Sequence, residues 1–140
     1  MRRPDLGYGM RHVALFVRDM AACEHFYVDL LGMEVEWRPD ERNVYLSSGS
    51  DNVALHQADA AGERDEAGQR LDHIGFFVKE AEDVDAWFGW LSAHGVRMRT
   101  EPRTHRDGAR SFYCYDPDGT HVQIIHHPPV CAWESLRGVN

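Results

Sequence analysis

The sequence predicts an α/β fold of the α+β type, built from two tandem βαβββ modules with mixed sheets. The first observation behind this prediction is an internal repeat. Residues 11–19 (RHVALFVRD) are echoed by residues 72–80 (DHIGFFVKE), with a histidine in the same place of each copy. The second observation is that the same order of helical and alternating patterns follows each copy. A duplicated structural unit with one site shared by the two copies accounts for both observations.

The first copy has the pattern of a strand, a helix and three further strands. Residues 12–17 are rich in β-branched and aromatic side chains, which is typical of a strand. Asp19 is placed to cap a helix whose apolar residues recur every three or four positions as far as Leu31. Gly32 ends this helix. Alternating patterns predict the remaining strands at 33–37, 43–48 and 52–57.

The second copy repeats this plan. A strand at 73–78 precedes a helix, which Gly95 ends. The apolar stripe of this helix comprises Val84, Trp87, Phe88 and Leu91. Three strands are predicted to follow, at 96–100, 111–115 and 121–126. The last two are joined by residues 116–119 (DPDG), which is a strong turn sequence.

These patterns divide the chain into a first module at 10–57 and a second at 71–127. A linker rich in Ala, Gly, Glu and Asp is predicted at 58–70. The tail at 128–140 begins with two prolines and has little pattern, so we expect it to lie on the surface or to contact a partner subunit through Trp133.

Charge and composition exclude several classes of function. A formal net charge of −8 argues against a nucleic-acid partner, which would require a basic surface. The apolar stretches are too short to span a membrane. The three cysteines, Cys23, Cys114 and Cys131, have no paired or zinc-finger spacing, which predicts a reduced, cytoplasmic protein.

The alternation of strand side chains places four polar groups on one side of the predicted sheets. His12 and His73 open the equivalent strands of the two copies. On the strand at 52–57, Val53 and Leu55 would face the helix, which leaves Ala54 and His56 on the opposite side. By the same argument His121 and Gln123 lie opposite Val122 and Ile124. Polar groups from four strands therefore converge.

At this point the chain resembles the vicinal oxygen chelate superfamily, which includes glyoxalase I, extradiol dioxygenases, methylmalonyl-CoA epimerase, and fosfomycin- and bleomycin-resistance proteins. The resemblance covers roughly residues 10–127. The segments that carry it are residues 11–15 (RHVAL), 26–33 (FYVDLLGM), 71–76 (LDHIGF) and 116–124 (DPDGTHVQI). It implies that two βαβββ modules form cupped mixed sheets. This fold hosts many chemistries, so the resemblance alone does not identify one activity.

The resemblance also implies a metal site. In metal-dependent members the ligands come from the first and last strands of both modules, and these positions correspond to His12, His56, His73 and Gln123. The last of these is commonly glutamate, so Gln123 departs from the pattern. An imidazole-rich, open site suits a divalent ion such as iron, zinc, nickel or manganese. A neutral set of ligands would favour an anionic or bidentate oxygen substrate and would hold the metal more weakly than a carboxylate does.

The same departure bears on mechanism, because an amide cannot accept a proton at neutral pH. Glyoxalase or epimerase activity would then need another base, such as His56, His121 or a tyrosine. The extradiol dioxygenases use two histidines and one glutamate, so the change weakens that assignment too. Candidate acid–base groups are Tyr113, Tyr115 and His121, and Tyr45 is a further one. The tyrosines could equally be sheet residues.

Large rings and the remaining histidines have alternative roles. Aromatic residues that could line an apolar pocket or pack in the core are Phe16, Trp37, Phe77 and Phe112. His105 lies in a polar loop, Thr104–Gly108, that could fold over the mouth of the cup. The histidines expected at the surface are His25, His94, His126 and His127.

The sequence thus predicts a metal-dependent enzyme that acts on a small oxygenated molecule, with chemistry of the dioxygenase or of the lyase and isomerase kind. Two alternatives stay open. One is a ligand-sequestering protein like the bleomycin-resistance members, and the other is a paralogue that has lost turnover, for which Gln123 is the main argument. The resemblance implies a homodimer. The substrate, the metal and the pairing of the modules within or between chains are not defined by the sequence.

Overall fold

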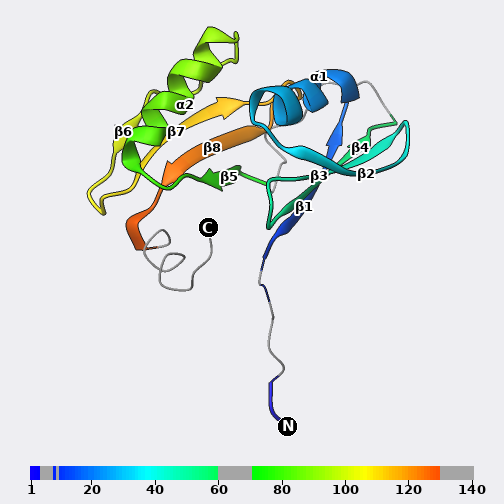
Figure 1. The fold of residues 1–140 in the computed structure, drawn as a ribbon, viewed down its shortest axis with the longest axis horizontal. Helices are drawn as coiled ribbons and strands as arrows, with labels where there is room; N and C mark the ends of the chain where they lie inside the picture. The colour runs from blue at the N-terminus through cyan, green and yellow to red at the C-terminus, as the bar shows by residue number, and fades with distance from the viewer. Residues whose placement is uncertain (4–7, 9, 60–70, 130–140) are drawn as a thin grey trace. The chain divides into compact units, whose positions relative to one another are not determined.

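The computed structural model describes residues 1–3, 8, 10–59 and 71–129. The chain divides into two compact units, Met1–Gly62 and Glu63–Asn140. Each unit holds one four-stranded mixed sheet and the helix that covers it (Figure 1). Most of the predicted linker at 58–70 and of the tail at 128–140, including Trp133 and Cys131, lies outside the described residues.

The first unit contains a sheet in the order β1-β4-β3-β2. Its strands are β1 (His12–Val17), β2 (Glu34–Asp40), β3 (Asn43–Ser47) and β4 (Asn52–Gln57). β1 runs parallel to β4, and the other neighbours are antiparallel. The helical segment between β1 and β2 packs on one face of this sheet (Figure 1).

That helical segment begins as predicted but has two geometries. The Asp19 side chain accepts a hydrogen bond from the Ala22 amide at 3.0 Å and so caps α1 (Met20–Glu24). The next six residues, η1 (His25–Leu30), form a π-helix. A π turn is wider than an α turn, and consecutive Phe26 and Tyr27 are both buried here with their rings in edge contact at 4.9 Å. The α-helical prediction was therefore wrong for the second half of this segment.

The second unit contains a sheet in the order β5-β8-β7-β6. Its strands are β5 (Ile74–Phe77), β6 (Arg103–Thr104), β7 (Arg110–Tyr115) and β8 (His121–His126). The order and directions of pairing repeat those of the first unit. A regular helix, α2 (Ala81–Ala93), packs against β7 and β8 and is followed by Gly95 at φ +77°.

The predicted strand at 96–100 is the main departure in the second unit. This segment forms only an isolated bridge, between Met98 and Cys114. The amides of Arg99 and Thr100 both donate to the Tyr113 carbonyl, at 2.8 and 3.1 Å. Two donors on one acceptor interrupt the regular ladder, so the regular edge strand is β6, which starts at Arg103.

Each unit buries one face of its sheet under its own helix. In the first unit the side chains of Val44, Leu46 and Leu55 are fully buried. In the second unit Phe112 and Val122 are fully buried, and Phe112 packs edge-on against Phe88 at 5.3 Å. Phe112 is thus a core residue, which is one of the two roles that the sequence left open. The opposite face of each sheet carries the predicted polar groups.

Candidate functional site

His12 is held by a chain of hydrogen bonds across the sheet of the first unit. Its Nδ1 lies 2.7 Å from Oδ1 of Asn52, its register partner on β4. The Asn52 amide nitrogen donates in turn to Glu36 at 2.7 Å, which leaves Oδ1 to accept. Nδ1 of His12 therefore carries the proton, and Nε2 keeps its lone pair. This is the tautomer in which a histidine binds a metal through Nε2.

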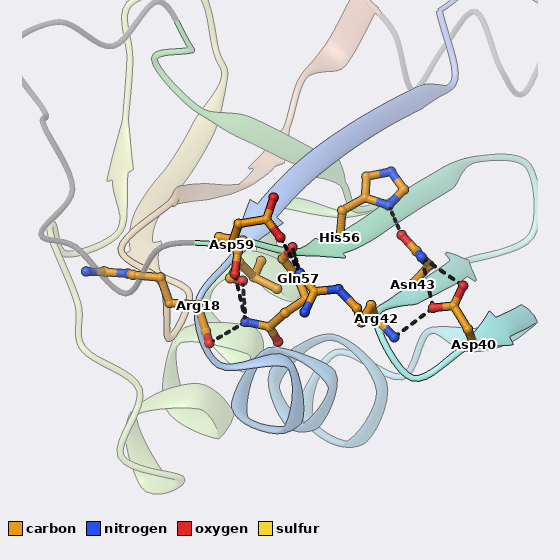
Figure 2. A network of polar contacts seen from close by, with 9 residues as sticks. Arg18, Asp40, Arg42, Asn43, His56, Gln57 and Asp59 are labelled. Atoms are coloured by element: carbon orange, nitrogen blue, oxygen red, sulfur yellow. Dashed lines mark hydrogen bonds and ion pairs between the residues drawn. The ribbon is translucent and has the colours of Figure 1, made fainter.

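His56 has the same arrangement with different residues (Figure 2). Its Nδ1 lies 2.6 Å from Oδ1 of Asn43, and the Asn43 amide nitrogen donates to both carboxylate oxygens of Asp40 at 2.9 and 3.0 Å. The Nε2 of His56 is again the lone-pair nitrogen. Asp40 also accepts from the Arg42 amide at 2.7 Å, which fixes the carboxylate at the turn between β2 and β3.

The sheet register separates these two histidines. His12 is level with Asn52, whereas His56 is level with Phe16, four residues further along β1. Because strands rise about 3.3 Å per residue, the two positions are roughly 13 Å apart along the sheet. They share a face but are not neighbours on it.

In the second unit, His73 lies just before β5 and bonds directly to a carboxylate. Its Nδ1 is 2.6 Å from Oδ2 of Asp72, so Nε2 is again available. The hydrogen bond from His73 is the main cause that lowers the pKa of Asp72 below its ordinary value, with the charges of His73, Arg99 and His121 adding to it. The ring of His73 also meets Tyr113 edge-on at 5.2 Å.

Gln123 lies beside this histidine. It is paired with Gly75 on β5 and with Tyr113 on β7. Its Oε1 is 3.6 Å from the place where a β-carbon at position 75 would stand, so the amide lies over Gly75. Among the described residues, no hydrogen bond of the Gln123 side chain is found. The structure thus brings His73, Tyr113 and Gln123 together on one face.

The repeat gives a different counterpart for Gln123 than the sequence did. Gln123 is the register partner of Gly75, which lies two residues after His73. The equivalent position two residues after His12 is Ala14, and its register partner is Ala54. His56 is two register pairs further along β4, on the same face as Ala54. Alternation alone could not show this, because Ala54 and His56 share a face. The proposed ligand role of His56 therefore rests on sequence position and not on the register of the repeat.

The predicted acid–base residues of the second unit lie on the same face as Gln123. Tyr115 is paired with His121, and their rings are 5.0 Å apart. Nδ1 of His121 accepts a hydrogen bond from the Arg99 guanidinium at 3.2 Å, because arginine can only donate. A neutral His121 then carries its proton on Nε2, opposite to His73. Arg99 also lies over the Tyr113 ring at 5.5 Å.

Other predicted residues have separate local contacts. His105 lines an open hollow of about 430 Å³ together with Arg103, Arg106 and Asp107. His25 pairs with Asp29 at the surface, and Nδ1 of His94 lies 2.8 Å from the Trp90 carbonyl. Phe77 is exposed and its ring is 6.5 Å from that of His127.

The residues that orient the histidines were missed by the sequence analysis. They are Glu36, Asp40, Asn43, Asn52 and Asp72. The two asparagines begin β3 and β4, so their positions beside histidines depend on strand pairing. Asp72 could have been recognised, because it directly precedes His73.

The donor atoms fit a divalent metal, although no ready-made cluster is present. Within the described ranges of the chain, there is no group of three or more His, Cys, Asp or Glu side chains that could hold an ion. The fit rests on tautomers: His12, His56 and His73 all present Nε2 with Nδ1 bonded to an oxygen.

Among the described residues, none of the helices has the length and the apolar composition of a membrane-spanning segment.

Comparison with known proteins identifies the family. The family model of the Glyoxalase/Bleomycin resistance protein/Dioxygenase superfamily matches residues 9–124, and the chain belongs to this superfamily. The family and fold predicted from the sequence are thereby confirmed.

Individual relatives are distant. The metallothiol transferase FosB of Staphylococcus haemolyticus is 27% identical over 117 residues, which cover 83% of this chain and 81% of FosB. The fosfomycin resistance protein FosX of Listeria monocytogenes is 26% identical over 125 residues, covering 84% and 88%.

Among solved structures, a lactoylglutathione lyase from Agrobacterium tumefaciens has a TM-score of 0.69 at 23% identity, over 89% of this chain and 96% of that one. This likeness shows the fold.

Proposed function

We propose that the chain is a metal-dependent enzyme that acts on a small oxygenated molecule. The observation that carries the proposal is the shared tautomer of the histidines that open the two repeats. His12 and His73 each direct Nδ1–H to an oxygen acceptor and leave Nε2 free to coordinate. Relatives that are named as a metallothiol transferase and a fosfomycin resistance protein agree with such a function.

The proposed metal ligands are His12, His73 and Gln123. When bound, a divalent ion at these three neutral donors would supply Lewis-acid polarisation of vicinal oxygens, or oxygen activation if it is iron. The chain's own contribution is orientation: Asn52 with Glu36 fixes the His12 ring, and Asp72 fixes the His73 ring.

Proton transfer would need a group other than Gln123, whose amide has no basic lone pair at neutral pH. Tyr113 is the candidate nearest to Gln123, because the two are register partners on β7 and β8. His121 and Tyr115 are one pair further along the same face.

Metal analysis tests the proposal. We expect near-stoichiometric metal in protein purified without chelator, and loss of that metal in the double variant His12→Ala/His73→Ala. The matched control is His25→Ala/His94→Ala, which removes two surface histidines whose Nδ1 contacts are local. No metal in the parent protein, even after divalent ions are added back, would contradict the proposal and favour a ligand-sequestering protein.

The variant His56→Ala distinguishes two ligand sets. If His56 is a ligand, as its sequence position suggests, the metal content falls as it does in the His12→Ala variant. If the repeat register decides the ligands, the variant keeps its metal. We expect the second result, since the register counterpart of Gln123 is Ala54.

We also propose a homodimer, which sedimentation velocity would reveal as a species of twice the 16.1 kDa chain mass.

A further inference from the structure

A row of aromatic side chains crosses the sheet of the first unit on the face opposite its helix. The Phe16 ring is 6.1 Å from the His56 ring, and the Tyr45 ring is 6.0 Å from it on the other side. Tyr45 in turn stacks on Trp37 at 5.2 Å with an interplanar angle of 21°. The aromatic row therefore draws one ring from each of β1, β4, β3 and β2.

This aromatic row does not belong to the core of the unit. Phe16 is 75% exposed and Trp37 is 59% exposed, whereas the core side chains Val44, Leu46 and Leu55 on the other face are fully buried. Large aromatic side chains that are exposed to solvent do not stabilise the fold by burial. Contiguous exposed apolar groups on a folded domain commonly mark a binding surface.

His56 gives this surface one polar group of defined character. The chain of hydrogen bonds from Asp40 through Asn43 commits Nδ1–H of His56, so Nε2 presents a lone pair between the flanking rings. Nε2 can accept a hydrogen bond from a ligand hydroxyl. The nearby cations are already engaged, because Arg38 pairs with Glu24 and Arg42 with Asp59. The surface therefore does not favour an anion.

We propose that the aromatic row binds a flat aromatic ring that carries an acidic hydroxyl group, that is, a phenol. The ligand ring packs against Phe16 and Tyr45, the two rings that flank His56, and its hydroxyl donates a hydrogen bond to Nε2 of His56. Offset or edge contacts between rings are favourable beyond the area they bury. The inference stands on the first unit alone and holds with or without a metal ion.

Binding of phenols in the presence of a chelator tests this inference separately from the metal proposal. The probe is 4-methylphenol, whose hydroxyl stays protonated at neutral pH, followed by calorimetric titration, with phenol, toluene, cyclohexanol and benzoate as competitors. Phenol should compete best, because toluene lacks the hydroxyl, cyclohexanol lacks the flat ring and benzoate is an anion. Equal competition by cyclohexanol or benzoate would overturn the proposed ligand class.

Two variants test the assigned contacts. Phe16→Ala should weaken all aromatic probes about 3- to 10-fold, as expected for the loss of one ring contact. His56→Ala should weaken phenol about 5- to 10-fold but leave toluene unchanged, because it removes one hydrogen bond. His56→Gln restores an acceptor oxygen and should recover part of the loss.

The second unit offers a matched control pair. Trp90 and His94 form a comparable exposed contact between a large ring and a histidine, at 4.0 Å, on and just after α2. Trp90→Ala and His94→Ala should leave binding unchanged, and circular dichroism should show that all variants are folded. If the control variants weaken binding as much as Phe16→Ala and His56→Ala, the site is elsewhere. If Phe16→Ala converts a dimer to a monomer without changing probe binding, the aromatic row is a subunit interface and the proposal is wrong.

Discussion

The two modules share one topology but differ on the face that carries their polar groups. In the first module, asparagines connect His12 and His56 to carboxylates, and the rings of Phe16 and Trp37 are left exposed. In the second module the Asp72 carboxylate is hydrogen-bonded directly to His73, without an intervening asparagine.

The tyrosines of the second module also differ from the exposed rings of the first. Arginines lie over both of them, with Arg97 at 3.8 Å from the centre of the Tyr115 ring. The face against the helix is apolar in both copies because it forms the core, whereas the opposite faces of the two sheets carry different residues.

The helices show the same contrast. The first module buries its rings on a π-helical segment after a single capped turn, whereas α2 in the second is a regular helix. A capping box between Glu80 and Asp83 fixes the start of α2. Each module buries a phenylalanine in its core. In the first module this is Phe26 on the helical segment, and in the second it is Phe112 on the sheet.

Removing either of these phenylalanines should have the largest effect on stability. Phe26→Ala and Phe112→Ala are each expected to lower the free energy of unfolding by about 3–5 kcal/mol, because each leaves a cavity in a core. Urea unfolding followed by circular dichroism measures this. Phe77→Ala is the control: its side chain is exposed, and the change should stay within about 0.5 kcal/mol. A loss below 1 kcal/mol at Phe26 or Phe112 would contradict the assignment of these cores.

The turns before the last strands give the next largest difference. Buried Asp116 accepts hydrogen bonds from the amides of Asp118 and Thr120, at 2.9 and 2.8 Å. Asp116→Ala should cost about 2–3 kcal/mol, because two buried amides lose their acceptor. Asp51 holds the corresponding turn of the first module by accepting from the Ser48 amide at 2.6 Å. That bond is exposed, so Asp51→Ala should cost about 1 kcal/mol or less. Equal losses in the two variants, measured by the same unfolding experiment, would refute the contrast.

Much of the fold could be predicted because burial alternates along β1, β3, β5 and most of β8. The strands at 12–17, 52–57 and 121–126 have the predicted bounds. The π-helical turn was missed, since one wider turn leaves the spacing of apolar residues nearly unchanged. The segment at 96–100 has an alternating pattern, but two amides sharing the Tyr113 carbonyl interrupt its pairing.

The candidate site was less predictable because it depends on register. Alternation shows which residues share a face, and it cannot show which residue of the neighbouring strand lies level with His12. For that reason Asn52 was overlooked, and alternation could not show that Ala54 is the register counterpart of Gln123. The ligand role of His56 stays a prediction.

Replacing the neutral amide of the second module tests whether Gln123 limits metal binding. Gln123→Glu adds a negative charge and should raise the affinity for zinc by on the order of tenfold, equivalent to about 1.4 kcal/mol. Calorimetric titration of the metal-free protein measures it. Ser92→Glu adds the same charge at an exposed position of α2 and should leave the affinity unchanged. Weaker zinc binding by the glutamate variant would argue against Gln123 as a ligand and against the idea that the chain is a degenerate metal enzyme.

The smallest effect is expected at the ion pairs that tie each helix to its sheet. Arg38 binds both carboxylate oxygens of Glu24 in the first module, and Arg110 binds both oxygens of Asp85 in the second. The hydrogen bond from Arg110 holds the pKa of Asp85 below its ordinary value of 3.8. A lowered folded-state pKa stabilises the protein above the unfolded-state value and ceases to do so as the pH falls through the folded-state value.

Asp85→Asn should therefore be less stable than the parent protein at about pH 6, and the two unfolding curves should converge in acid, below the ordinary aspartate pKa of about 3.9. Urea unfolding over a pH series measures this difference. Glu82→Gln, on the exposed first turn of the same helix, is the control, since no ion pair of the Glu82 side chain is found among the described residues. A stability difference that persists unchanged into acid would mean that Asp85 acts through packing on β7 and not through its charge, because only the charged form pairs with Arg110.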